Sequence, residues 1–122
     1  MSYNVNTIDV FEKQAKILVK KYASLKSEIF DLIQILKENP ESQISLWKNC
    51  YKIRISIASK GKGKSGGARI ITNFVVTDET VYLLSIYDKS EKENISDKEL
   101  DNLLLNIPEW LMIFKTYQRC LR

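Results

Sequence analysis

The sequence of 122 residues contains no histidine. Its absence removes the usual general base of enzymes and the commonest transition-metal ligand. Cysteine occurs only twice, at Cys50 and Cys120, which excludes a disulfide framework and leaves no metal-ligand spacing. No apolar run reaches the length of a membrane span, and the N-terminus lacks the pattern of a signal peptide. We therefore expect a cytoplasmic protein with no membrane partner, no metal and no cofactor.

Acidic residues are missing from one long stretch of the chain. Residues 48–76 carry seven lysines and arginines and no aspartate or glutamate, although the net charge of the whole chain is only +4. Such a block is typical of a surface that binds a polyanion. The length and the hydrophobic fraction of 44% indicate a single globular domain.

Glycine is scarce, and all four glycines lie in the loop that runs from Lys60 to Gly67. Lys60, Lys62 and Lys64 alternate with them. The loop lacks the spacing of a Walker motif, which argues against a P-loop NTPase. Two interpretations of the loop stay open: its lysines and bare backbone approach a nucleic-acid phosphate, or it simply joins two strands of a hairpin.

The strand predicted from Cys50 onward has two contrasting faces. Successive residues of a strand point to opposite sides, so Lys52 and Arg54 share one face, and the other face is apolar. Neighbouring cations repel each other, and either a solvated outer surface or an anionic ligand explains them. The apolar face holds Tyr51, Ile53, Ile55 and Ile57.

The remaining pattern predicts an α+β fold. A short strand over 3–8 precedes a helix with Asp9 as N-cap and Glu12 in a capping box, and a second helix runs from Ser24 to Asn39-Pro40. A polar loop over 41–49, three antiparallel strands and a helix capped by Ser96 and Glu99 follow, and Pro108 ends that helix. We expect this αα-hairpin to pack on a curled, mainly antiparallel four-stranded sheet with a C-terminal helix. Residues 1–107 then form one domain, and 108–122 are an apolar extension that packs on the sheet, dimerises or docks a partner.

Several segments resemble a known family. Lys62-Gly-Lys-Ser-Gly-Gly-Ala-Arg69 and Val81-Tyr-Leu-Leu-Ser-Ile-Tyr-Asp-Lys-Ser-Glu-Lys92, together with the strand at Cys50, resemble the RelE superfamily of bacterial type II toxins, most closely its HigB-like branch. The resemblance implies a RelE-like fold over residues 1–107 and cleavage of mRNA on the translating ribosome. It also implies neutralisation by a cognate antitoxin, often a helix-turn-helix protein, which alone contacts the operator DNA.

The resemblance also implies a set of working residues. The two basic residues of the strand after the helix hairpin are Lys52 and Arg54, the arginine of the next strand is Arg69, and a further basic position falls on Lys89. The tyrosine that the family carries near its C-terminus is missing, because Ile95 stands near that position. Tyr87 and Tyr117 are the candidates to replace it.

The residue types suit a metal-independent endoribonuclease. Cleavage through the 2′-hydroxyl of the RNA needs a base, charge stabilisation at phosphorus and an acid. We assign Lys52 as the base, with a pKa that neighbouring cations would lower. Arg54 and Arg69 hold the phosphate, and Lys89 is an acid or a second clamp. The residues expected to bind RNA are Tyr87, Lys92 and the loop lysines Lys60, Lys62 and Lys64.

The sequence leaves two other functions open. One is a ParE-like inhibitor of gyrase that cuts no RNA, and the other is a catalytically inactive relative that only binds RNA. Growth arrest with codon-phased mRNA cuts would indicate the nuclease, whereas DNA damage without such cuts would indicate the gyrase inhibitor.

Overall fold

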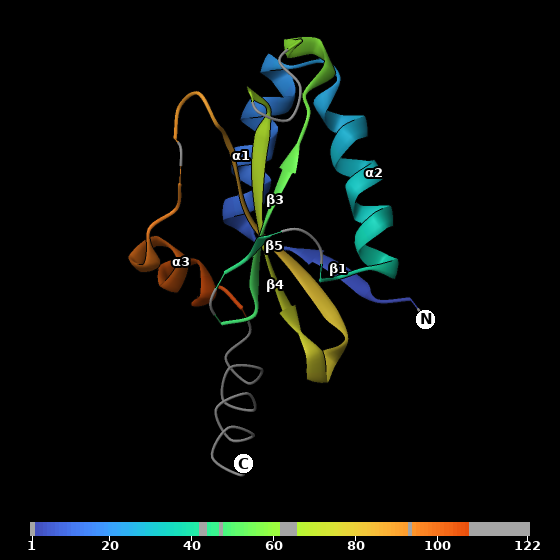
Figure 1. Ribbon diagram of the computed structural model, residues 1–122, viewed down its shortest axis with the longest axis vertical. Coiled ribbons are helices and arrows are strands. Elements are labelled where there is room, and N and C mark those ends of the chain that lie inside the picture. Colours follow the sequence, from blue (N-terminus) through green and yellow to red (C-terminus); the bar gives the residue numbers. More distant parts are fainter. Residues whose placement is uncertain (1, 42–43, 47, 62–65, 93, 108–122) are drawn as a thin grey trace.

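The computed structural model describes residues 2–41, 44–46, 48–61, 66–92 and 94–107. Within them the chain forms a five-stranded sheet with the strand order β1-β5-β4-β3-β2 (Figure 1). The elements in chain order are β1 (Asn4–Thr7), α1 (Asp9–Lys21), α2 (Leu25–Glu38), β2 (Ile44–Ser45), β3 (Cys50–Ile55), β4 (Ala68–Val75), β5 (Thr80–Asp88) and α3 (Asp97–Leu104).

The sheet is mixed, because β1 pairs in parallel with β5 while the other neighbours are antiparallel. The predicted α+β class is confirmed, but the prediction of four mainly antiparallel strands is wrong. The additional strand is β2, a two-residue segment within the stretch that we expected to be a polar loop. Its Ile44 and Ser45 pair with Lys52 and Tyr51 of β3, so β2 protects the outer edge of that strand.

The start of α1 differs from the predicted capping box. The residue before the helix is Ile8, which has no side-chain cap, and Asp9 is the first helical residue. Glu12 instead accepts a hydrogen bond at 3.0 Å from the hydroxyl of Thr7. Acidic side chains in the first turn still favour the helix, since they face the positive end of its dipole.

The other helix ends follow the sequence signals more closely. α2 follows Ser24 and ends at Glu38, just before Asn39-Pro40. The capping box of α3 is confirmed, because Ser96 and Glu99 make both of its reciprocal hydrogen bonds. α3 ends at Leu104, several residues before Pro108, so that proline is not what ends it.

The central strands β3, β4 and β5 separate two faces of the sheet. Ile53, Ile70 and Ile86 oppose one another across these strands and are buried on the side of α1, and we call this side the hairpin face. The opposite side carries Lys52, Arg54, Arg69 and Tyr87, and we call it the cationic face. Figure 1 shows α2 on one side of the strands and α3 on the other.

Gly67 explains how closely the chain returns from the loop to the sheet. A Cβ atom at this position would lie 2.0 Å from the carbonyl oxygen of Ile55, so only glycine fits against β3 there. The next residue, Ala68, begins β4 opposite Ile55. This close approach fixes where Arg69 enters the sheet. No helix in the described ranges has the length and apolar character needed to cross a membrane.

Candidate functional site

The cationic face contains a row of three residues from three strands. Arg54 of β3 lies directly opposite Arg69 of β4, and Arg69 lies directly opposite Tyr87 of β5. Side chains that oppose each other in an antiparallel sheet have Cβ atoms about 5 Å apart, and like charges in such pairs destabilise the sheet. The fold therefore brings Arg54, Arg69 and Tyr87 together across three adjacent strands.

Arg69 is the buried member of this row. Its side chain is only 2% exposed, and its Nη1 donates a hydrogen bond at 3.2 Å to the carbonyl oxygen of Ala68. Burial, and after it the neighbouring charge of Arg54, lowers the pKa of the Arg69 guanidinium below its ordinary value. Arginine nevertheless stays protonated in proteins. The site therefore holds a buried positive charge beside a second, exposed one.

Tyr87 brings a hydroxyl group to the same row. Its side chain is 8% exposed, and its hydroxyl has no hydrogen-bond partner within the described part of the chain. Burial is the main cause that raises the pKa of this phenol above its ordinary value, so the hydroxyl stays protonated at neutral pH. A buried hydroxyl without a partner costs about 1–3 kcal/mol. Tyr87 thus presents a hydrogen-bond donor that a ligand could satisfy.

Further cations border the row. The Lys52 ammonium donates a hydrogen bond at 3.2 Å to the side-chain oxygen of Asn94. The Lys92 ammonium lies 5.5 Å from the centre of the Tyr87 ring and forms an ion pair with Glu99 of α3. Lys52 and Lys92 are therefore near the row, the first held by Asn94 before α3 and the second by Glu99 within α3.

Lys89 follows β5 directly. Its backbone N–H donates a hydrogen bond at 3.1 Å to the carbonyl oxygen of Gly67, and its side chain is half-buried. The contact joins the end of β5 to the start of β4. The backbone of Lys89 thereby lies beside the entry to the strand that carries Arg69.

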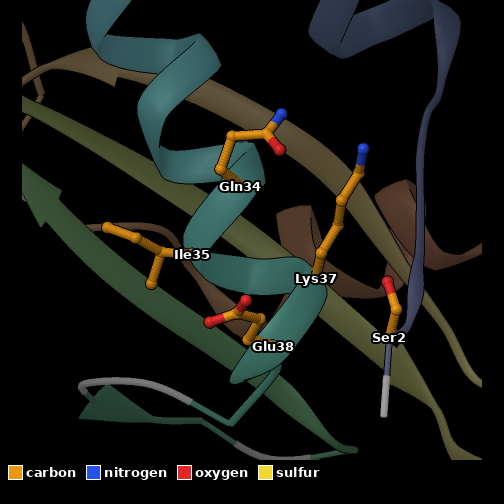
Figure 2. Close-up of a pocket in the computed structure, with 5 residues that line it drawn as sticks. All are labelled: Ser2, Gln34, Ile35, Lys37 and Glu38. Atoms are coloured by element: carbon orange, nitrogen blue, oxygen red, sulfur yellow. The ribbon is translucent and has the colours of Figure 1, made fainter.

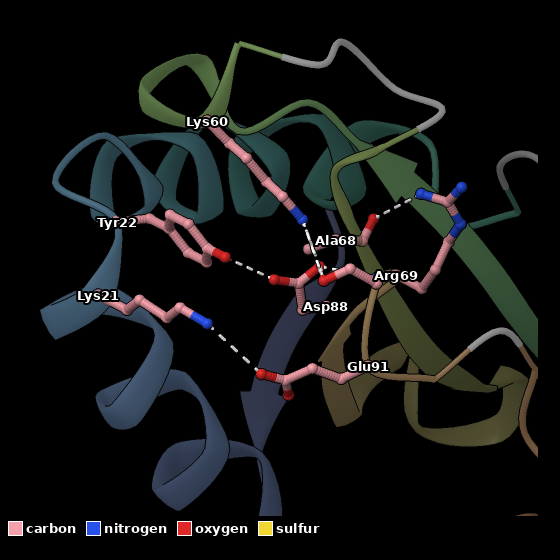
Figure 3. A network of polar contacts seen from close by, with 8 residues as sticks. Lys21, Tyr22, Lys60, Ala68, Arg69, Asp88 and Glu91 are labelled. Carbon is pink, nitrogen blue, oxygen red and sulfur yellow. Dashed lines mark hydrogen bonds and ion pairs between the residues drawn. The ribbon is translucent and has the colours of Figure 1, made fainter.

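Lys60 lies on the other side of the sheet, where it is neutralised. Its ammonium is 2.5 Å from a carboxylate oxygen of Asp88, and the hydroxyl of Tyr22 donates to the same carboxylate at 2.6 Å. Figure 3 shows both groups converging on Asp88 while the guanidinium of Arg69 points away from it. The structure thus separates Lys60 from the cationic face. Lys62 and Lys64, like Tyr117 and the extension 108–122, lie outside the described residues.

Sequence reasoning missed Asp88 and Tyr22 altogether. The available signal was the position of Asp88 in β5, where it shares the parity of the buried Ile86. A carboxylate on the apolar side of a strand needs a buried partner. That partner could not be found from local sequence, since Tyr22 and Lys60 are distant in the chain.

Three hollows of the described surface lie away from the cationic face. The largest of those described, of about 690 Å³, is lined by Ser2, Gln34, Ile35, Lys37 and Glu38 at the end of α2 (Figure 2). Its lining mixes one cation with one carboxylate, and none of the predicted site residues belongs to it. Within the described ranges no cluster of cysteine and carboxylate side chains is suited to hold a metal ion.

The fold and the cationic face together describe an α+β protein suited to bind phosphate. An αα-hairpin covers one face of a mixed sheet, and the other face gathers arginine, lysine and tyrosine side chains around the ends of β3, β4 and β5. Such a face suits a phosphate-containing ligand, because arginine binds phosphate oxygens in a fixed, bidentate geometry.

Comparison with known proteins identifies the family. The sequence profile of the RelE toxin of the RelE/RelB toxin–antitoxin system matches residues 10–115. The chain therefore belongs to the RelE toxin family of toxin–antitoxin systems.

Solved structures agree with the fold. The isolated E. coli RelE toxin matches with a TM-score of 0.56 and 14% identity, over 84% of this chain and 96% of that one. RelE in the intact E. coli RelBE toxin–antitoxin complex matches with a TM-score of 0.54 and 14% identity, over 71% and 96%. A free mutant form of E. coli RelE gives 0.54 and 16%, over 76% and 90%. At these identities the likeness concerns the fold alone.

Proposed function

We propose that the protein is a toxin that cuts mRNA on the translating ribosome and needs no metal ion. The observation that carries this proposal is the row Arg54–Arg69–Tyr87 on the cationic face of a RelE-family chain. Two opposed arginines and an unpartnered hydroxyl form an arrangement that a phosphodiester would complete. Translation takes place in the cytoplasm, so the proposal also places the protein there.

The proposed reaction is attack of the RNA 2′-hydroxyl on the adjacent phosphorus. Lys52 takes the proton of the 2′-hydroxyl as the new P–O bond forms. Arg54 and Arg69 bind the phosphate oxygens, where negative charge increases in the transition state. The bond to the 5′-oxygen breaks, and Tyr87 or Lys89 supplies the proton to that oxygen. The products are a 2′,3′-cyclic phosphate and a 5′-hydroxyl.

Tyr87 takes the place of the missing C-terminal tyrosine in this scheme. Its hydroxyl stays protonated at neutral pH because burial raises its pKa, which suits a proton donor. Lys92, above the Tyr87 ring, would contact a neighbouring phosphate after release from Glu99. The cationic face thus offers a base, two clamps and a donor from adjacent strands.

The same proposal includes the branch of the family and the kind of antitoxin. We place the chain in the HigB-like branch and expect a cognate helix-turn-helix antitoxin that neutralises it and binds the operator DNA. The E. coli RelBE complex is a precedent for a RelE-family toxin bound to its antitoxin. A small helix-turn-helix protein encoded next to this chain that relieves its toxicity would support this part of the proposal.

The proposal is tested by inducing the protein in bacteria and mapping both mRNA ends and DNA breaks. Codon-phased mRNA cuts without DNA damage are expected. DNA damage without mRNA cuts would instead indicate the ParE-like gyrase inhibitor. Neither effect, together with retained binding to ribosomes, would indicate an inactive RNA-binding relative.

A further inference from the structure

Asp88 is a buried carboxylate with several hydrogen-bond donors around it. Its side chain is 0% exposed at the end of β5. It accepts hydrogen bonds from the Tyr22 hydroxyl at 2.6 Å and the Lys60 ammonium at 2.5 Å. The backbone N–H and the hydroxyl of Ser90 donate to it at 3.0 and 2.8 Å. Burial alone would raise the pKa of Asp88, but the contacts from Lys60, Tyr22 and Ser90 outweigh it and hold the pKa far below its usual range.

The partners of Asp88 come from three separate parts of the fold. Tyr22 follows the end of α1, Lys60 precedes the glycine-rich loop, and Ser90 lies in the turn after β5. The carboxylate therefore links the helix hairpin, the start of the glycine-rich loop and the end of a central strand (Figure 3).

The segment just before the glycine-rich loop is also hydrogen-bonded to residues at the start of α2. The backbone N–H of Ala58 donates to the Glu28 carboxylate at 2.8 Å, and the N–H of Ser59 donates to the Ser24 hydroxyl at 3.0 Å. These contacts leave the Lys60 side chain only 10% exposed. An ammonium held in this way is committed to Asp88 and is not presented to a polyanion.

The position of Asp88 in the chain connects this cluster to the cationic face. Its neighbours are Tyr87, which opposes Arg69, and Lys89, whose N–H donates to Gly67. Asp88 itself opposes Ala68, the residue before Arg69. Fixing the Asp88 carboxylate on the hairpin face thus fixes the backbone from which Tyr87, Lys89 and Arg69 extend.

We propose that Asp88 is a positioning residue for Arg69 and Lys89, and that Lys60 serves as its fixed counter-ion instead of contacting RNA. The inference rests on the proposed nuclease function. It makes Asp88, Lys60 and Tyr22 a partly buried support beneath the site, without contact to the reacting atoms. Misplacing catalytic groups by about 1 Å costs on the order of 10²-fold in rate, so loss of the support should act on the chemical step.

The test compares Asp88→Asn, Lys60→Met and the milder Tyr22→Phe with wild type, and uses Lys26→Met, an exposed lysine of α2, as the matched control. Single-turnover cleavage is measured on ribosomes carrying mRNA. Affinity and its salt dependence are measured with mRNA that has one 2′-deoxy nucleotide at the cut position. Amide hydrogen exchange is followed at Lys89.

Asp88→Asn and Lys60→Met are expected to slow cleavage by tenfold to 10²-fold and to change affinity less than threefold. Exchange at the Lys89 amide should become faster in both variants. Tyr22→Phe should show the same changes more weakly. It tests the positioning role of Asp88 if Asp88→Asn fails to fold. Lys26→Met should behave as wild type.

Two results would overturn the inference. A Lys60→Met variant with weaker binding and a salt slope reduced by about one unit would show that Lys60 contacts a phosphate. Cleavage by Asp88→Asn at the wild-type rate would show that the cluster positions nothing. If wild type cuts no mRNA, the proposed function fails by itself, and the exchange at Lys89 alone decides whether Asp88 fixes that backbone; unchanged exchange would refute it.

Discussion

The two faces of the central strands treat charge in opposite ways. On the hairpin face the charged Asp88 accepts hydrogen bonds from several donors, and one of them, the Lys60 ammonium, neutralises it. On the cationic face Arg54 and Arg69 are placed directly against each other, and the neighbouring Tyr87 hydroxyl has no partner within the described residues. The same three strands therefore hold a carboxylate with several donors on one face, and two opposed arginines beside an unpartnered hydroxyl on the other.

This difference indicates a structural role for the hairpin face and agrees with the activity proposed for the cationic face. Removing one partner from a buried ion pair destabilises the fold, whereas opposed cations and an unpartnered hydroxyl already lower its stability. Positions that cost stability persist where a ligand uses them. Variants on the hairpin face should thus change stability first, and variants on the cationic face should change activity first.

Asp88→Ala should have the largest effect on stability. It leaves the Lys60 ammonium without its partner, and breaking a buried pair in this way costs about 3–5 kcal/mol. The free energy of unfolding, measured with urea, checks this value. Asp31→Ala, which removes an exposed carboxylate of α2, is the control and should change the value by less than about 0.5 kcal/mol. Equal effects of the two variants would show that the Asp88 cluster contributes no stability.

Arg69→Ala should have the largest effect on activity. Loss of one phosphate-binding group is expected to slow mRNA cleavage by about 10²- to 10³-fold. Arg69→Lys should recover only part of the rate, since lysine lacks the planar fork of arginine. Single-turnover cleavage rates decide the outcome, and retained cleavage in Arg69→Ala would exclude this residue from the site.

Acid should abolish the contribution of Asp88 to stability. Its pKa is lowered in the folded state, whereas an unfolded aspartate titrates near about 3.9. The contribution is therefore complete above that value and is lost as the pH falls toward the folded pKa. The difference in unfolding free energy between wild type and Asp88→Asn should be constant from pH 7 to about 5 and shrink below about 4. A difference independent of pH would mean that Asp88 is not ionised in the fold.

Tyr87→Phe should give the smallest effect on stability, with opposite signs for stability and activity. Removing a buried hydroxyl without a partner is expected to raise the unfolding free energy by about 1 kcal/mol. Cleavage should become slower, because the proposed proton donor is lost. Denaturation and cleavage assays on the same preparation measure both. A destabilised Tyr87→Phe would indicate a structural partner for the hydroxyl.

Local patterns in the sequence predicted which side chains share a face. The alternation around Lys52 and Arg54 separated a cationic from an apolar side, and the proline after Asn39 and the capping box at Ser96 located two helix ends. Each of these signals lies within a few residues of the feature that it predicts. The fold therefore follows from sequence where the determining contacts are local.

Features that depend on distant contacts were missed. The parallel pairing of β1 with β5 joins residues from opposite ends of the domain, and the two-residue β2 is too short for any alternation. Lys60 was predicted to bind RNA from its place among the glycines, and its ion pair with Asp88 of β5 could not be read from that local pattern. Only the folded chain shows that one lysine of the basic block is already neutralised.

The central claim is that the cationic face cuts RNA through the RNA's own 2′-hydroxyl. The most direct measurement is analysis of the ends produced when the purified protein acts on mRNA bound to ribosomes. A 2′,3′-cyclic phosphate and a 5′-hydroxyl at discrete positions are predicted, and one 2′-deoxy nucleotide at the cut position should abolish the cut. Intact mRNA, or cleavage that continues at the 2′-deoxy position, would contradict the account.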